Sequence, residues 1–225
     1  MKHSLTILVP GLALLAVVLA RPPLARAGSI TETVTVNTTS FVGSTNSFEV
    51  YFSLTDGSGS GDGNNTVTLS GFSFGSGGSA GAVDTGNTSN AAGDLASSVT
   101  MNDAGNFADS FAAFFTPGSS LSFTIADAFT SLASPTPDML SFALVDNGAL
   151  LTTNDPSLND NLVTLTLDSA SGTTAVYTDQ NAFDSVGTPT VGSPVSAPEP
   201  PSWILLFAGL GLLGIASRSR LRRAS

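Results

Sequence analysis

The sequence contains no cysteine, and its few cationic residues all lie near the two ends of the chain. The interval 28–217 contains no lysine, arginine or histidine, whereas all 17 acidic residues fall inside it. The formal net charge of −10 therefore understates the partition, because 17 acidic and no basic side chains give this interval a charge of −17. We expect a strongly acidic body between two short cationic ends.

These absences exclude several function classes. Without histidine or cysteine, the body cannot hold a Ser-His-Asp triad, a cysteine nucleophile or a typical zinc site. Without lysine it can form neither a Schiff base nor a phosphate-binding loop of the Walker type. Nucleic acid is not an expected partner, because cationic side chains supply most of that affinity. Two chemistries remain: paired carboxylates acting as acid and base, and hard cations such as calcium held by oxygen ligands.

The N-terminal segment 1–27 has the composition of a signal peptide. An apolar run over residues 5–20 follows a polar start and precedes the small residues Ala25 and Ala27. This order predicts export and cleavage by signal peptidase after Ala27. Cleavage after Ala20 is the alternative, because two arginines stand between the apolar run and the predicted site.

The C-terminal region has three parts. Residues 187–201 are rich in proline and small side chains, and we expect an extended linker that contains the motif Pro198-Glu199-Pro200. Residues 202–217 form an apolar segment, which predicts a transmembrane helix, and residues 218–225 form an arginine-rich tail on the cytoplasmic side. The predicted anchor residues are Trp203, Ile204, Leu205, Leu206, Phe207, Leu210, Leu212, Leu213 and Ile215, and the predicted stop-transfer residues are Arg218, Arg220, Arg222 and Arg223.

The order of motif, apolar segment and terminal arginines resembles the PEP-CTERM sorting signal of Gram-negative bacteria. Ala197 stands before the motif, where valine is commoner in that family. The resemblance implies recognition by exosortase, an integral-membrane transpeptidase-like enzyme, and processing near Pro198-Glu199-Pro200. It further implies a transient stay in the inner membrane, followed by delivery to the cell surface or an extracellular matrix. A permanent anchor that is never cut is the alternative.

The body, residues 28–186, shows a hydrophobic period of two. Apolar and polar residues alternate over 48–54, 121–125, 140–144 and 163–167, with threonine and serine between the apolar positions. Frequent turn signals separate these runs, and no long amphipathic helix is present. The fold class predicted is all-β, a single β-sandwich of the jelly-roll type.

Two stretches of the body are less regular. Gly71 interrupts a strand pattern, which predicts a bulge or a bend. The phenylalanines from Phe107 to Phe115 have the spacing of a helical stripe, but a bulged strand also accommodates them. A strand is favoured, because residues 116–119 then form a turn into the next strand. We expect these phenylalanines to lie in the core.

Two oxygen-rich loops are candidate metal sites. In the loop 56–65, Asp56, Asp62 and Asn64 are candidate calcium ligands, although the loop lacks the EF-hand spacing. The alternative is a polar hairpin loop in which glycine and asparagine adopt positive φ. The loop 154–160 is either a second metal loop or an Asx turn.

The sequence predicts a protein that is not an enzyme and that has a structural or adhesive role in an exopolysaccharide or biofilm matrix. No cofactor is expected apart from the candidate calcium. A carbohydrate-binding module is the alternative and would need exposed aromatics, for which the body offers only the tyrosines Tyr51 and Tyr177. A glycosidase is a further alternative. Glu49 is the one acid expected inside a strong strand, on its polar face, and no partner is evident for it.

Overall fold

The structure is a computed structural model that describes residues 28–57, 61–130, 136–168, 173–180, 190–192 and 195–196. The predicted signal peptide, the Pro198-Glu199-Pro200 motif, the membrane segment 202–217 and the arginine tail lie outside the described residues. Within the described ranges, no helix has both the length and the apolar character needed to cross a membrane.

The described residues form strands and one short 3-10 turn, η1 (Thr39–Phe41). The strands are β1 (Gly28–Asn37), β2 (Phe48–Thr55), β3 (Asn65–Ser73), β4 (Ser79–Val83), β5 (Ala91–Gly93), β6 (Ser98–Asn102), β7 (Ala108–Thr116), β8 (Ser120–Phe129), β9 (Met139–Asp146), β10 (Ala149–Leu150), β11 (Val163–Thr166), β12 (Thr173–Val176), β13 (Thr190–Val191) and β14 (Val195–Ser196). The all-β prediction is confirmed.

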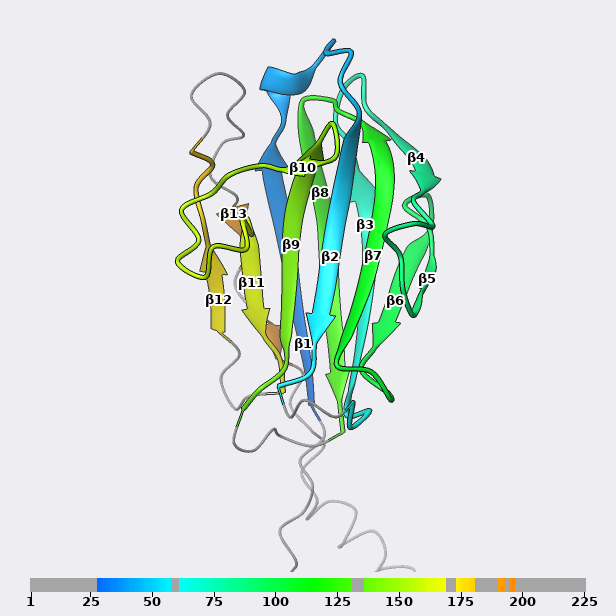
Figure 1. Ribbon diagram of the computed structural model, residues 1–225, viewed down its shortest axis with the longest axis vertical. Coiled ribbons are helices and arrows are strands. Elements are labelled where there is room, and N and C mark those ends of the chain that lie inside the picture. The colour runs from blue at the N-terminus through cyan, green and yellow to red at the C-terminus, as the bar shows by residue number, and fades with distance from the viewer. Residues whose placement is uncertain are drawn as a thin grey trace, which may run out of the picture.

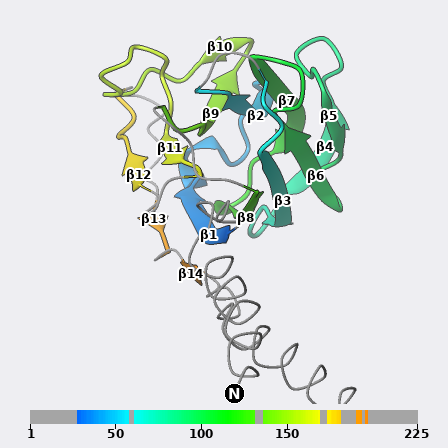
Figure 2. The same cartoon turned by 90° about the horizontal axis from the view of Figure 1, so that it is seen from below.

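The strands form two antiparallel sheets that lie face to face (Figures 1 and 2). Sheet A has the order β13-β1-β8-β3-β6-β5, with β14 also beside β1. Sheet B has the order β12-β11-β9-β2-β7-β4, with β10 beside β9. The result is a sandwich-like arrangement in which each long strand buries one face against the opposite sheet.

Alternation of side chains fills the space between the sheets. In β8, Leu121, Phe123 and Ile125 are buried while the serine and threonine residues between them are half-buried. Phe123 reaches across to sheet B, where its ring lies 5.1 Å from that of Phe52 and 4.9 Å from that of Phe142. Such offset and edge-to-face aromatic contacts add to the stability gained from apolar burial. This aromatic cluster fixes the distance and the register between the sheets.

The structure shows what the two irregular stretches of the body, around Gly71 and from Phe107 to Phe115, form. At Gly71 the backbone adopts φ +64°, and the pairing of β3 with β8 shifts between Ser70 and Ser73, which confirms the bulge. The phenylalanine-rich stretch is a strand, β7, as favoured. The expectation that all its phenylalanines lie in the core is wrong for two of them. Phe114 points to the outer face of sheet B, and Phe107 precedes the strand and is 60% exposed.

Sheet A extends beyond the predicted boundary of the body at residue 186. Within the expected linker 187–201, β13 and β14 pair antiparallel with β1, with Val191 opposite Val34 and Ser196 opposite Ile30. Backbone pairing of this kind needs only extended conformation, which a proline-rich segment readily adopts. The described residues Thr190–Val191 and Val195–Ser196 therefore lie at the edge of sheet A, although both belong to the expected linker.

The aromatic cluster gives a direct test of this core. Phe123→Ala is expected to lower the free energy of unfolding by about 3–5 kcal/mol, because it removes a fully buried ring and leaves a cavity. Phe107→Ala is the matched control, with an expected change within about 0.5 kcal/mol for an exposed side chain. Urea unfolding of the full chain, followed by circular dichroism, measures both. A larger loss for the Phe107 variant would contradict the placement of both residues.

Candidate metal centre

At one end of the sandwich, the core-facing rows of side chains change from apolar to acidic. The end in question is the lower one in Figure 1, where β2, β6 and β8 finish and β9 begins. In five places an acid or amide stands two residues from a buried apolar side chain, and it therefore lies on the same face of the strand. The pairs are Leu54 with Asp56, Val67 with Asn65, Met101 with Asp103, Ile125 with Asp127, and Leu140 with Asp138.

Loops add further polar side chains to this group. We call the whole set the acidic end, comprising Asp56, Asp62, Asn64, Asn65, Asp103, Asp127, Asp138 and Asp168. All of these except Asp62 are buried. The same alternation that builds the core thus carries carboxylates into the space between the sheets.

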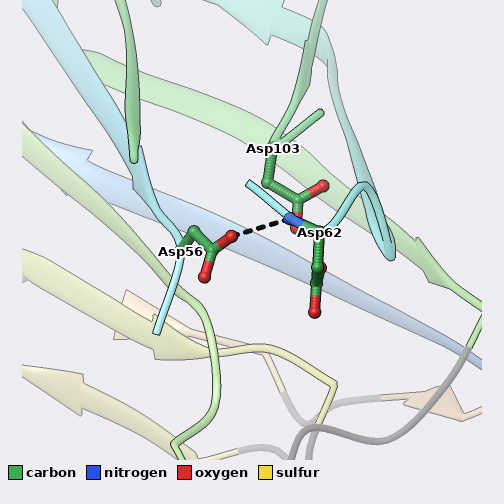
Figure 3. A group of neighbouring side chains, drawn as sticks. All are labelled: Asp56, Asp62 and Asp103. Carbon is green, nitrogen blue, oxygen red and sulfur yellow. Dashed lines mark hydrogen bonds between the residues drawn. The ribbon is translucent and has the colours of Figure 1, made fainter. Parts of the chain in front are cut away.

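Three of the carboxylates converge. Asp56, Asp62 and Asp103 each offer one oxygen, and these oxygens lie within 4.8 Å of one another (Figure 3). The backbone N–H of Asp62 donates to Oδ2 of Asp56 at 2.9 Å. The N–H of Gly105 donates to the carbonyl of Gly61 at 3.1 Å, which holds the Asp62 loop against the turn after β6. Asp62 is exposed, so one side of the group is open to solvent.

Two further carboxylates organise the surrounding loops. Asp138 accepts hydrogen bonds from the N–H of Gly57 at 2.7 Å and from the side chain of Asn65 at 2.6 Å. Asp168 accepts from the N–H of Asp138 at 3.0 Å and from the side chain of Asn64 at 3.0 Å. Since these partners come from both sheets, the two aspartates tie the sheets together at the acidic end.

Burial without a positive partner raises proton affinities at this end. Burial raises the pKa of Asp127 to about 7, and neighbouring carboxylates, first that of Asp168, add to the rise. Burial likewise raises the pKa of Asp103 to about 7, with a further rise from Asp138 and an opposing hydrogen bond from the Asn65 backbone. The pKa of Asp168 is also raised by burial. Charged groups at such positions need protons, donors or a cation.

Several oxygen atoms at the acidic end have no donor. Within the described part of the chain, no donor lies in good hydrogen-bonding geometry to either carboxylate oxygen of Asp127, although the residue is only 1% exposed, and the backbone N–H of Asp168 compensates its charge only in part. Oδ2 of Asp103 and Oδ1 of Asn65 are likewise buried and without a donor in such geometry. Buried polar atoms in native proteins are nearly always satisfied, so these oxygens indicate an additional ligand, ordered water or bound protons.

The sequence-based ligand set is only partly reproduced. The structure brings Asp56 and Asp62 together, as expected, but Asn64 turns its amide nitrogen toward carboxylates, donating to Asp62 at 3.3 Å and to Asp168 at 3.0 Å. Asp103 takes the third position, and sequence reasoning missed it. The sequence does indicate which way Asp103 faces. It stands two residues after the buried Met101, and side chains two residues apart in a strand lie on the same face.

The second oxygen-rich loop is an Asx turn. Asp155 accepts hydrogen bonds from the N–H of Ser157 at 2.9 Å and from the side chain of Asn161 at 2.8 Å. Burial opposes ionisation here, yet the hydrogen bonds from Ser157 and Asn161 lower the pKa of Asp155. Its charge is therefore met by donors, in contrast to that of Asp127.

The residues considered for catalysis or sugar binding are covered. Glu49 does not stand on an open polar face, since it is 7% exposed, and burial followed by the nearby Asp84 raises its pKa. Glu49 is also not the one acid inside a long strand, because Asp109 and Asp127 lie within β7 and β8. Asp84 directly follows β4, a strand that was not predicted, and so the short strand brings a second acid close to Glu49.

The two tyrosines form no exposed platform. Tyr51 and Tyr177 are both half-buried, and the hydroxyl of Tyr177 lies 3.4 Å from that of Thr164.

Comparison of the chain with protein-family models, curated proteins and solved structures gave no match. The acidic end is therefore interpreted from its own geometry.

The raised pKa values predict how a cation-free sample responds to pH. The folded chain holds protons on Asp103 and Asp127 up to about pH 7, whereas the unfolded chain releases them near the ordinary value of 3.8. Stability is therefore greatest near or below pH 4 and falls as the pH rises to about 7. We expect the melting temperature to drop by at least about 5 °C, since a pKa unit corresponds to about 1.4 kcal/mol.

Thermal unfolding of the full chain after treatment with a chelator, followed by circular dichroism from pH 4 to 8, measures this response. Asp127→Asn removes one of the buried charges with little change in shape and is expected to flatten the curve. Asp155→Asn, at a carboxylate that donors already satisfy, keeps the slope. A melting temperature that is constant or rises between pH 5 and 7 would show that these groups are not protonated in the folded state.

Proposed function

We propose that this chain is an exported protein with a structural or adhesive role at the cell surface or in an extracellular polysaccharide matrix. The observation that carries the proposal is the order of the C-terminal region, in which Pro198-Glu199-Pro200 precedes an apolar segment and four arginines. The pairing of β14 with β1 is compatible with it, because the last described residue, Ser196, lies at the edge of sheet A and stands two positions before Pro198 in the sequence.

A non-enzymatic role is supported by the burial of Glu49, the acid that sequence analysis considered for catalysis, and of Glu32 in β1. Glu49 is 7% exposed and Glu32 is 2% exposed. The hydroxyl of Thr174 lies 2.6 and 2.8 Å from the two carboxylate oxygens of Glu32, so this acid joins β1 to β12. A polysaccharide chain cannot reach carboxylates that are covered in this way, whereas glycosidases place both acids beside the bond to be cleaved.

The surface chemistry is consistent with a matrix environment. Between Gly28 and Ser217 there are no cationic side chains, so hydroxyls, amides and carboxylates make up the polar surface. An acidic polysaccharide and an acidic protein repel one another unless divalent cations stand between them. Adhesion to such a polymer would therefore depend on calcium or magnesium in the medium.

The type of β-sandwich is also part of the proposal. We infer a jelly-roll-like sandwich, because most connections between the long strands cross from one sheet to the other, as from β1 to β2 and from β7 to β8. Jelly rolls occur widely in lectin-type and capsid domains, so this class is compatible with an adhesive role without requiring it.

The intact mass of the protein released from cells tests the proposed destination. In a strain with active exosortase, we expect a product that starts near Gly28 and ends near Pro198-Glu199-Pro200. In a strain without the enzyme, we expect the chain to retain Arg222 and Arg223 and to stay with the membrane. Retention of the arginines in both strains would identify a permanently tethered protein instead.

Binding to the released matrix tests the role. We expect the processed protein to pellet with purified exopolysaccharide in calcium-containing buffer and to remain soluble in a chelator. Tyr51→Ala is the matched variant for the alternative of a carbohydrate-binding module, and we expect it to bind as the wild type does. Loss of binding in the Tyr51 variant alone would favour that alternative.

A further inference from the structure

The group Asp56, Asp62 and Asp103 is the one set of carboxylates, within the residues that the structure describes, whose oxygens converge closely enough for a single metal ion. We propose that the acidic end is a calcium-binding site in which these three carboxylates hold the ion. The proposal concerns the folded body alone and does not depend on where the protein is delivered.

The set of ligands fits calcium. Calcium accepts irregular sets of protein carboxylates at about 2.3–2.6 Å, whereas magnesium usually keeps several waters and binds through one or two carboxylates. The oxygens of the three aspartates lie within 4.8 Å of one another. Oxygen is also the one type of donor available, because the body contains no histidine or cysteine. This donor set favours a hard cation over zinc.

Clustered carboxylates are common on acidic surfaces, so the convergence alone does not indicate an ion. The independent observation is Asp127, which is 1% exposed and continues the core-facing row of β8 into the acidic end. Neither of its oxygens has a donor in good hydrogen-bonding geometry among the described residues, and the N–H of Asp168 only partly offsets its burial. The buried Oδ2 of Asp103 and Oδ1 of Asn65 are likewise without donors there. Solvation explains exposed carboxylates, but it does not explain these atoms.

The surroundings of the three aspartates resemble the outer layer of a metal site. Asp138 holds the N–H of Gly57, the residue after Asp56, and the amide of Asn65, whose own N–H donates to Asp103 at 3.2 Å. Hydrogen bonds of this kind orient ligands before an ion arrives and raise their affinity for it. The exposed Asp62 leaves a path for the ion and room for water ligands.

The ion would join the two sheets. Asp56 follows β2 of sheet B, whereas Asp103 follows β6 of sheet A. Because the ligands are far apart in the sequence, the site exists only in the folded chain, and calcium bound there favours folding. Calcium would also compensate the buried negative charge of these carboxylates.

Calorimetric titration of the full-length chain, purified in detergent and freed of divalent ions, tests the site. We expect calcium to bind at millimolar concentration or below, as in extracellular calcium modules. We also expect calcium to raise the melting temperature at pH 7.5 by at least about 5 °C over that in a chelator. The same concentration of magnesium is expected to give less than half of this shift.

The variant Asp103→Asn tests whether Asp103 is a calcium ligand or an acid with only a structural role. In the chelator, this variant is expected to melt at the same temperature as the wild type or higher, because it removes a buried charge. In calcium, it is expected to show no measurable binding and no rise in melting temperature. Loss of stability in both buffers, with calcium binding retained, would assign Asp103 a structural role and overturn the proposal.

Asp155→Asn is the matched control, since Asp155 is equally buried but its carboxylate is satisfied by Ser157 and Asn161. It is expected to melt lower in both buffers and to bind calcium as the wild type does. Absence of calcium binding by the wild type, or equal effects of magnesium and calcium, would also overturn the proposal. Neither outcome bears on the sorting of the chain, which the mass measurement decides separately.

Discussion

The structure depends on how buried negative charge is accommodated in a body that has no cationic side chain. Burying an ionised carboxylate is costly unless donors, protons or a positive charge compensate it. Asp155 represents compensation by donors, with Ser157 and Asn161 around its carboxylate. Asp127 represents the opposite case, because no described donor lies in good hydrogen-bonding geometry to it and its pKa is raised to about 7. The acidic end combines both cases, since donors compensate Asp138 and Asp168 but leave Asp127 largely uncompensated.

The aromatic core and the acidic end are products of the same strand register. Phe123 packs on Phe52 and Phe142 in the centre of the sandwich, and this packing fixes how the sheets face each other. Further along β8, the same face of the strand carries Asp127. A shift of one residue would expose the phenylalanines, so the carboxylates cannot move away from one another. The apolar core thus holds the repelling groups in place, and its stability limits how much repulsion the fold tolerates.

The dependence of both the core and the acidic end on strand register also determines how much of the structure the sequence predicts. The long strands followed from alternation of apolar and threonine-rich positions, and the bulge followed from Gly71. The short strands β4 and β5 were missed because their glycine, alanine and serine residues carry no periodic signal; they lie in sheets only because long strands offer free edges. Phe107 was misplaced, since its spacing from Phe111 suits a helix and not the strand that forms.

The candidate site was partly predictable. Asp56 and Asp62 lie in one oxygen-rich loop, which is a local pattern. Asp103 stands some forty residues further along the chain, and only the pairing of β3 with β6 brings it beside Asn65. Its phase relative to Met101 predicts that it faces inward, but a single sequence does not show which inward-facing acids meet. Convergence of ligands is a property of the topology, and the local pattern supplies only the candidates.

The position of the acidic end relative to the ends of the described body has a physical consequence. Ile30 in β1 lies opposite Asp127 on one side and opposite Ser196 on the other. One strand therefore connects the carboxylates to the last described residues before the Pro198-Glu199-Pro200 motif. If the charges at the acidic end are not compensated, repulsion acts on β8, which pairs with β1, and β1 in turn pairs with β14. Compensation by protons or a cation thus stabilises both the site and the edge of the sheet from which the C-terminal region continues.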